Sequence, residues 1–83
     1  MAIEYGRLRG TTARELISAL VRDGFAFDRG SGSHQIYRHN DGRRVTVTFH
    51  GSGDTFAPKT LKSMIETQAK WTVEDLKRLK LIG

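Results

Sequence analysis

Residues 25–50 read FAFDRGSGSHQIYRHNDGRRVTVTFH, and this stretch decides the fold that we predict for the 83-residue chain. Side chains alternate between the two faces of a strand, and residues 44–50 follow that alternation. Their apolar face comprises Val45, Val47 and Phe49, and their polar face comprises Thr46, Thr48 and His50. Asp41-Gly42 is typical of a hairpin turn, because this pair tolerates a positive φ. Residues 34–39 are therefore expected to form the neighbouring antiparallel strand.

A third strand is expected on the other side of this hairpin. Residues 25–27 alternate large and small side chains, and Gly30-Ser31-Gly32 predicts a flexible turn between them and the next strand. Residues 51–54 (GSGD) are predicted to form a mobile loop after the last strand. The segment as a whole thus predicts a three-stranded antiparallel sheet.

A helix is predicted before the sheet, over roughly residues 13–22. Thr12 and Glu15 have the spacing of a capping box, in which each side chain binds the backbone N–H of the other residue. One apolar stripe recurs at helical spacing and comprises Ala13, Leu16, Ile17, Leu20 and Val21. Gly24 can take the left-handed conformation that commonly ends a helix.

Two more helices are predicted after the sheet. Pro58 suits the first turn of a helix, because its missing N–H would have no intrahelical partner there. The buried stripe of this helix is expected to comprise Leu61, Met64, Ile65 and Ala69. The segment Thr72 to Asp75 resembles a second N-terminal cap, which would begin a short helix over about residues 73–80. Trp71, between the two helices, is expected to be a core residue.

The predicted order of elements is α-β-β-β-α with an extra C-terminal helix. Such an order gives an α+β domain in which the helices pack on one face of the sheet, the layout of a double-stranded-RNA-binding domain. A domain of this size buries only about 60% of its unfolded surface. Any catalysis is therefore expected to use a few side chains on an open surface and to act on a large or extended substrate.

The composition indicates the class of partner and the compartment. The formal net charge of +5 favours association with polyanions through phosphate contacts. The chain contains no cysteine, which excludes disulfides and thiolate zinc sites and favours a reducing compartment. Its apolar runs are short, and Glu4 stands where a signal peptide would begin its hydrophobic stretch. We expect a cytoplasmic protein without a membrane partner.

His34 is the candidate for the chemistry. It follows Gly32-Ser33 at the start of a predicted strand, where backbone can approach a ligand closely. Cleaving RNA through its own 2′-hydroxyl requires one proton to be removed from that hydroxyl and another to be delivered to the leaving 5′-oxygen. Imidazole can perform either transfer near neutral pH. The alternative is a strand-end histidine that is hydrogen-bonded near Ser31 or Ser33 and has no chemical role.

Basic residues around this histidine are candidates for holding phosphate. They flank the hairpin turn and occupy the first turns of the second helix: Arg38, Arg43, Arg44, Lys59 and Lys62. Lys59 also stands at a helix start, where backbone N–H groups favour anions. The alternative is a solvated surface on which Lys62 pairs with Glu66, four residues later on the helix.

Three further residues are candidates for contact with RNA. Ser33 adjoins His34 in the sequence. Tyr37 can stack on a base if it faces outward, whereas Ile36 is the outward residue if Tyr37 packs inward. His50 is either a second proton-transfer group beside His34 or an ordinary strand-end residue.

A metal site is a further alternative. His34, His39 and His50 could together bind zinc or iron, because both metals accept imidazole ligands. No spacing among them matches a known ligand pattern, however, and no acidic fourth ligand is close by in the sequence. Gly30-Ser31-Gly32 also lacks the preceding buried strand and following helix of a nucleotide-binding loop. We expect neither a metal nor a cofactor.

The order of several short motifs is fairly specific. These are the first helix with Glu15, Leu16 and Leu20, the Asp23-Gly24-Phe25 exit, Gly32-Ser33-His34, Val45-Thr46-Val47 with His50 after it, and Thr60-Leu61-Lys62-Ser63-Met64-Ile65. Together they resemble the HicA toxin family of bacterial toxin-antitoxin modules, over residues 12–66. The chain departs from the usual family pattern at Thr48, where a proline is common, and at Lys59, where a glycine is common.

The resemblance implies a fold similar to a double-stranded-RNA-binding domain and a type II toxin that cleaves messenger RNA independently of the ribosome. It gives the catalytic role to His34 alone. It also implies a HicB-type antitoxin as a partner that covers the active site, and an acidic antitoxin surface would complement a basic toxin.

We expect residues 1–83 to form a single HicA-like domain. Residues 12–66 are its matching core, residues 1–11 are an N-terminal extension, and residues 67–83 carry the C-terminal helix. Two other functions stay open. One is a non-catalytic RNA-binding module on the same fold, and the other is a small partner-binding protein whose basic face meets an acidic protein.

Overall fold

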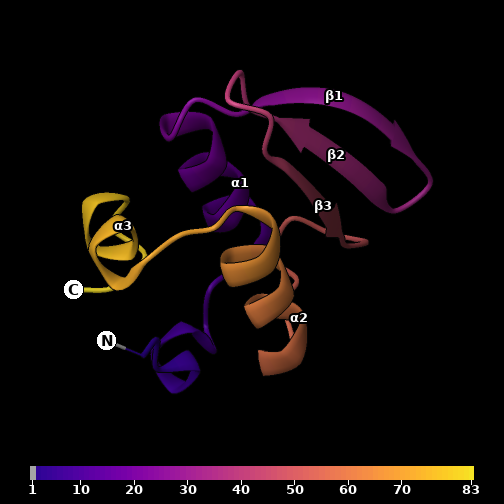
Figure 1. Ribbon diagram of the computed structural model, residues 1–83. Coiled ribbons are helices and arrows are strands. Elements are labelled where there is room, and N and C mark those ends of the chain that lie inside the picture. Colours follow the sequence, from indigo (N-terminus) through magenta and orange to yellow (C-terminus); the bar gives the residue numbers. More distant parts are fainter. Residues whose placement is uncertain (1) are drawn as a thin grey trace.

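The computed structural model describes residues 2–83, so only Met1 of the predicted N-terminal extension lies outside the described residues. The elements in chain order are η1 (Tyr5–Leu8), α1 (Ala13–Arg22), β1 (Ala26–Ser31), β2 (His34–Arg38), β3 (Arg44–Thr48), α2 (Pro58–Lys62), η2 (Ser63–Gln68) and α3 (Val73–Arg78). The strands form one antiparallel sheet in the order β1-β2-β3, and the helices gather on one side of it (Figure 1). The predicted α+β class and order of elements are confirmed, with η1 as an addition.

Helix α1 begins and ends as its sequence predicts. The Thr12 hydroxyl accepts the Glu15 backbone N–H at 3.2 Å, and the Glu15 carboxylate accepts the Thr12 N–H at 3.0 Å. Gly24 follows the helix with a φ of 103°. The capping box and the glycine exit are therefore both confirmed.

The loop over residues 51–54, which was predicted to be mobile, is hydrogen-bonded to the start of α1. The Ala13 N–H donates to the Asp54 carbonyl oxygen at 2.8 Å, and the Arg14 N–H donates to the Ser52 carbonyl oxygen at 3.0 Å. The first N–H groups of a helix have no intrahelical acceptor, and this loop supplies one to each of these two. The Asp54 carboxylate accepts the N–H groups of His50 and Gly51, and these bonds lower the pKa of Asp54.

The turn between β1 and β2 is shorter than predicted. Gly30 and Ser31 belong to β1 and pair with Gln35 and His34, so only residues 32–33 form the turn. Gly32 has a φ of 60°, as the first position of a two-residue type II′ turn requires. The predicted break at Gly30-Ser31-Gly32 was therefore wrong, because two of its residues take part in strand pairing.

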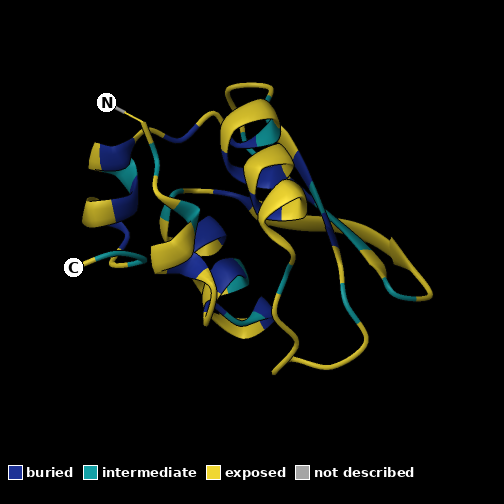
Figure 2. Cartoon of the chain, turned by 90° about the horizontal axis from the view of Figure 1, so that it is seen from below, coloured by how far each residue is buried: buried dark blue, intermediate teal, exposed yellow. Residues whose placement is uncertain are grey.

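The core lies between the sheet and the helices, where Figure 2 shows the buried positions. The predicted stripe of the second helix is buried throughout: Leu61, Met64, Ile65 and Ala69. Val45 and Val47 of β3 and Trp71 are also buried, as predicted. Val21 is 55% exposed and does not belong to the α1 stripe that we predicted. Leu8 of η1 lies in the same hydrophobic cluster as Trp71, so both terminal segments contribute to one core.

A polar cluster ties the C-terminal segment to the end of α1. Asp23 is its centre. The carboxylate accepts Trp71 Nε1–H at 2.8 Å and Arg78 Nη2–H at 2.8 Å, and Arg43 Nη1 lies 3.2 Å away. The ring of His39 lies against the same corner, with Nε2 2.9 Å from the Asp23 carbonyl oxygen. We call Asp23, His39, Arg43, Trp71 and Arg78 the Asp23 cluster.

The charges of the Asp23 cluster favour the ionised carboxylate. Burial of the Asp23 carboxyl group opposes its ionisation, but the hydrogen bonds from Trp71 and Arg78 and the positive charges of Arg43 and Arg78 outweigh burial and lower its pKa. Gly24 permits the close packing here, since a Cβ at this position would lie 2.8 Å from His39 Nε2.

Candidate functional site

Helices cover one face of the sheet at β2 and β3, every residue of β1 is exposed, and the opposite face is open. On the covered face, Tyr37 pairs with Val45 and Gln35 pairs with Val47. Because side chains alternate, the residues between them point to the other side. We call that side the open face, and it comprises Arg29, Ser31, His34, Ile36, Arg38, Arg44, Thr46 and Thr48. None of these residues is buried.

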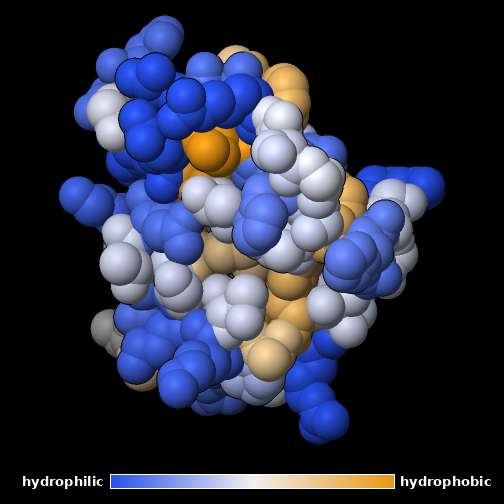
Figure 3. Space-filling model, turned by 90° about the vertical axis from the view of Figure 1, so that its right-hand side faces the viewer, coloured by the Kyte–Doolittle hydropathy of each residue, from blue (hydrophilic) through white to orange (hydrophobic). Residues whose placement is uncertain are grey.

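Hydrophilic side chains dominate the end of the molecule at which the sheet lies. Figure 3 views the side onto which the β1–β2 turn projects and shows such side chains gathered at the top, around a small hydrophobic spot. This uncovered polar surface is accessible to a large ligand. We expected such an open surface because a domain of this size buries too little of its chain to enclose a deep cavity.

His34 opens β2 on the open face, and one of its two ring nitrogens is engaged. Nδ1 lies 3.0 Å from Thr48 Oγ1 on the neighbouring strand. The backbone around it is held as well, because His34 pairs with Ser31 and with Thr48 and the Phe49 N–H donates to the Ser33 carbonyl oxygen at 3.0 Å. Within residues 2–83, Nε2 has no hydrogen-bond partner. The imidazole is thus an oriented, exposed group with one free nitrogen.

Three arginines share the open face with this histidine. Arg38 and Arg44 lie directly opposite each other on β2 and β3, and neither has an ion-pair partner among the described residues. Arg29 has only Asp28, at 4.0 Å. Like charges directly opposite each other destabilise a sheet, and residues that break such a rule without compensation often serve a function. The arrangement suits an anion that contacts both Arg38 and Arg44.

Arg29 was missed by the sequence analysis, because the first strand was predicted to end at residue 27. A register shift lies between Phe27 and Arg29, so one residue is bulged out of the pairing and the simple alternation fails there. The pairing of Arg29 with Ile36 places it on the open face. The sequence did contain a signal for a longer first strand, because residues 28–31 include no proline that would end it.

Tyr37 lies on the covered face, which corrects its prediction as a base-stacking residue. It is only 6% exposed, and its hydroxyl donates to Gln35 Oε1 at 2.8 Å. Burial raises the pKa of Tyr37. Its ring meets the ring of Phe27 edge to face, with 5.7 Å between the ring centroids. The other alternative therefore holds, and Ile36 is the outward residue.

Arg43 is also placed away from the open face. Its guanidinium donates to Asp41 Oδ2 at 2.8 Å and to the Ala69 carbonyl oxygen at 2.7 Å, and it stacks over the Phe25 ring. Together with the contact to Asp23, these bonds engage Nε and Nη1 of Arg43 inside the protein. Arg43 was predicted as a phosphate ligand, and the structure places it in the Asp23 cluster and not on the open face.

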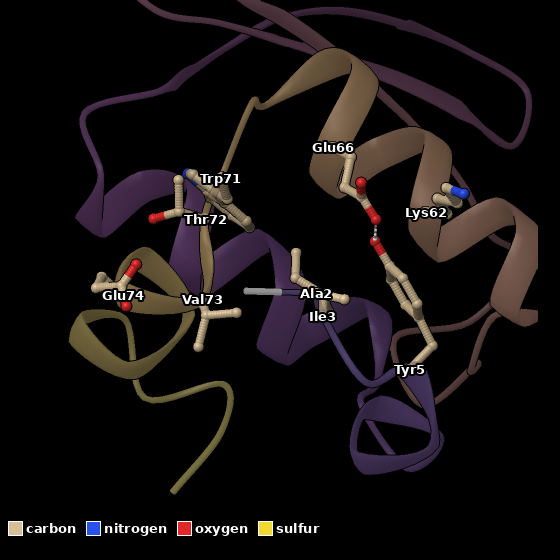
Figure 4. A pocket seen from close by; sticks show the side chains of 9 residues that line it. All are labelled: Ala2, Ile3, Tyr5, Lys62, Glu66, Trp71, Thr72, Val73 and Glu74. Carbon is tan, nitrogen blue, oxygen red and sulfur yellow. Dashed lines mark hydrogen bonds between the residues drawn. The ribbon is translucent and has the colours of Figure 1, made fainter.

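Lys59 and Lys62 come from α2, on the side of the molecule that covers the sheet. Lys62 lines an open groove of about 520 Å³ that Tyr5, Glu66 and Trp71 also line. Figure 4 shows the Glu66 carboxylate turned to the Tyr5 hydroxyl, which donates a hydrogen bond to it, while Lys62 points elsewhere. The Lys62–Glu66 ion pair, which we considered as the alternative to phosphate binding, is not formed. Burial and the bond to Glu66 raise the pKa of Tyr5.

Ser33 and His50 lie near the His34 end of the sheet. Ser33 belongs to the turn that precedes β2, and His50 follows β3 two residues after Thr48. The His50 side chain is exposed, while its backbone N–H donates to Asp54 Oδ2 at 2.9 Å. The structure therefore brings Ser33 and His50 to the region of His34.

The histidines do not form the three-histidine metal site that we considered. His39 lies in the Asp23 cluster, where Nε2 contacts the Asp23 carbonyl oxygen and Nδ1 accepts the Asp41 N–H at 3.1 Å. In the described part of the chain, no group of three or more His, Cys, Asp or Glu residues is arranged to hold a metal ion. Residues 2–83 also contain no helix with the length and apolar character needed to cross a bilayer.

The fold and this site define a small two-layer α+β domain whose sheet has one uncovered, basic face. A family model described as HicA toxin of bacterial toxin-antitoxin matches residues 13–71. This segment is more than half of the chain and includes α1, the whole sheet, α2 and η2, so the chain belongs to the HicA toxin family. No curated protein matches the chain in a sequence comparison.

Membership defines the general role of the protein. The chain is the toxin component of a bacterial toxin-antitoxin system. Its family is one of ribonuclease toxins, and a toxin of this kind has an antitoxin as its partner.

Proposed function

We propose that the protein is a ribosome-independent endonuclease that cleaves messenger RNA in the cytoplasm, with His34 as the group that transfers the proton. The observation that carries this proposal is the exposed imidazole on the open face, held through Nδ1 at 3.0 Å and free at Nε2. A positioned acid or base contributes about 10² to 10⁴-fold to a rate. The remaining acceleration must come from neutralising and orienting the phosphate.

The proposed reaction uses the RNA as its own nucleophile. The 2′-oxygen attacks the adjacent phosphorus while the bond from phosphorus to the 5′-oxygen breaks. The 2′-hydroxyl proton leaves to a base, and the 5′-oxygen receives a proton from an acid. The products are a 2′,3′-cyclic phosphate and a free 5′-hydroxyl, and His34 acts at Nε2 as the base or as the acid. We propose that no metal ion is needed, since proton transfer and charge neutralisation are the tasks that a metal would otherwise perform.

The arginines of the open face are proposed to bind phosphates beside the cleaved one. Arg38 and Arg44 lie four residues along their strands from His34 and Thr48, which corresponds to about 13 Å at the rise of a strand. A strand of RNA several nucleotides long can contact both positions at once. This arrangement favours a polymer over a mononucleotide.

The open face is also the surface that we propose for a HicB-type antitoxin. Arg38 and Arg44 lack ion-pair partners within the described chain, and an acidic partner surface would supply them. Covering this face would hide His34 and the arginines together. Inhibition would then require no change in the shape of the toxin.

The test is cleavage of a defined single-stranded RNA by the purified wild type and by His34→Ala, in EDTA, with both new ends identified. We expect cleavage by the wild type, a 2′,3′-cyclic phosphate on one product, and a loss of at least 100-fold in His34→Ala. His39→Gln is the control, since His39 lies in the Asp23 cluster and not on the open face. Binding without cleavage by the wild type would identify a non-catalytic RNA-binding module instead.

A further inference from the structure

We propose that Thr48 is a positioning residue for His34. Its hydroxyl oxygen accepts a hydrogen bond from Nδ1–H of the imidazole, which leaves Nε2 as the atom that exchanges a proton with RNA. This inference rests on the proposed function of His34, and it adds a residue to which neither the family match nor the sequence analysis gives a role.

The contact follows from the register of the sheet. His34 and Thr48 are directly opposite each other on β2 and β3, where Cβ atoms lie about 5 Å apart. The hydroxyl therefore reaches Nδ1, at 3.0 Å, without a distortion of either strand. On the other side of His34, Ser31 occupies the pairing position, but within residues 2–83 only Thr48 binds the ring. Thr48 thus fixes the direction of the imidazole.

The positions of the ring protons explain why a hydroxyl acceptor suits both roles of His34. As a base, the neutral ring takes the 2′-hydroxyl proton on the Nε2 lone pair, so its own proton must already be on Nδ1. As an acid, the imidazolium gives its Nε2 proton to the 5′-oxygen and keeps the proton on Nδ1. In each case Nδ1–H persists and donates to Thr48 Oγ1. The hydroxyl orients the ring without adding a negative charge beside it.

The size of the effect is that of one hydrogen bond. A net intramolecular hydrogen bond of this kind corresponds to about a tenfold change in a rate when it is formed in the reacting state. Thr48→Val removes the hydroxyl but keeps the shape and the β-branched character that suit a strand. We therefore expect this variant to fold and to cleave RNA with a kcat about tenfold lower and an unchanged KM.

The matched control is Thr46→Val. Thr46 lies on the same strand and on the same face, but it pairs with Ile36 and not with His34. Its variant is expected to keep the wild-type kcat. Thr48→Ser restores the hydroxyl and is expected to recover most of the lost rate, which a purely structural role of the Thr48 methyl group would not predict.

The decisive measurement is the ¹⁵N spectrum of the His34 ring in the protein without RNA, at a pH at which the ring is neutral. We expect the Nδ1–H tautomer to predominate in the wild type and in Thr46→Val, and its share to fall in Thr48→Val. A predominant Nε2–H tautomer in the wild type would overturn the proposal, as would a tautomer ratio that does not respond to Thr48→Val.

The two proposals can fail separately. If the wild type cleaves no RNA, the proposed function fails, while the ¹⁵N spectra still decide whether Thr48 sets the tautomer of His34. If the wild type cleaves RNA and Thr48→Val does so at the wild-type kcat, the proposed function survives and the role of Thr48 is rejected.

Discussion

The open face and the Asp23 cluster contain the same kinds of side chain in opposite situations. His34 is exposed with a free Nε2, whereas His39 has a backbone contact at each ring nitrogen. Arg44 has no ion-pair partner among the described residues, whereas its neighbour Arg43 contacts the Asp23 carboxylate at 3.2 Å. Charged groups with partners inside the protein stabilise the fold, and those without partners are available to a ligand.

The comparison also shows how adjacent residues acquire different roles. Arg44 begins β3 and lies on the open face, while Arg43 precedes the strand and turns toward the C-terminal segment. Nothing in the chemistry of the two arginines distinguishes them. The position at which the strand begins decides which one meets a partner inside the protein.

The largest expected effects come from exchanging the two histidines for glutamine, one at a time. His34→Gln should lower the kcat for RNA cleavage by at least 100-fold without changing the melting temperature, because an amide keeps the polarity but cannot transfer the proton. His39→Gln should lower the melting temperature and leave the kcat of the folded protein unchanged. Cleavage kinetics and calorimetry on the same samples measure both quantities. A loss of activity in His39→Gln at a temperature at which it is folded would remove the distinction between the two regions.

The next largest effect is expected in the Asp23 cluster. Asp23→Asn removes the charge that holds Arg43 and Arg78, and the loss of hydrogen bonds to a partly buried charged group costs about 3 kcal/mol. For a domain of this length, that corresponds to a decrease in melting temperature of roughly 15 °C. Urea unfolding measures the change directly. Asp28→Asn is the matched control, since Asp28 is exposed and lies 4.0 Å from its arginine; a similar loss in both variants would contradict a special role for the cluster.

The two regions also differ in how much of each could be predicted from the sequence. Local signals were sufficient where the interaction is local: the Thr12 and Thr72 caps and the Pro58 start are all present as predicted. The exposed position of His34 also agreed with its place after Gly32. Pairings between distant segments could not be predicted, because they depend on how α3 and the strands pack together.

Two corrections illustrate this limit. Arg43 was predicted to hold phosphate, since a basic residue beside a hairpin turn gives no sign that Asp23, 20 positions earlier, lies next to it. Arg29 was missed for the opposite reason, because a bulge in β1 interrupts the alternation that would have placed it. The contact between Thr48 and His34 required the register of β2 and β3, which the alternation within each strand does not define.

A smaller effect is expected from removing the arginine pair of the open face. Arg38→Gln with Arg44→Gln should weaken binding of single-stranded RNA about tenfold and reduce the slope of log K against log salt by about 1.4, or about 0.7 for each lost phosphate contact. Fluorescence anisotropy over a range of salt concentrations measures both.

The matched control removes two cations from the opposite end of the molecule. Arg7→Gln with Lys77→Gln lowers the net charge equally, and both residues line a shallow pocket beside the N-terminal segment. This control is expected to leave the slope within a few tenths of the wild-type value. Equal changes in the two double variants would show that net charge alone governs binding. The proposal that the open face binds RNA would then be rejected.

The smallest effect is a difference in the pH dependence of stability between the wild type and Asp23→Asn. Burial opposes ionisation of Asp23, but its hydrogen bonds and the neighbouring arginines lower its pKa in the folded protein below that of the unfolded chain, which is about 3.9. The folded state therefore binds this proton less tightly. The contribution of Asp23 is complete above the unfolded pKa and is lost as the pH falls through the folded pKa. Urea unfolding between pH 7 and pH 2 should show a steeper loss in the wild type than in Asp23→Asn. Glu15 and Asp54 also have lowered pKa values, but they lie outside the cluster and cancel between the two proteins. Asp41 and Asp75 bind Arg43 and Arg78 and strengthen the same contrast. Parallel curves would mean that the Asp23 carboxylate gains nothing from the cluster that surrounds it.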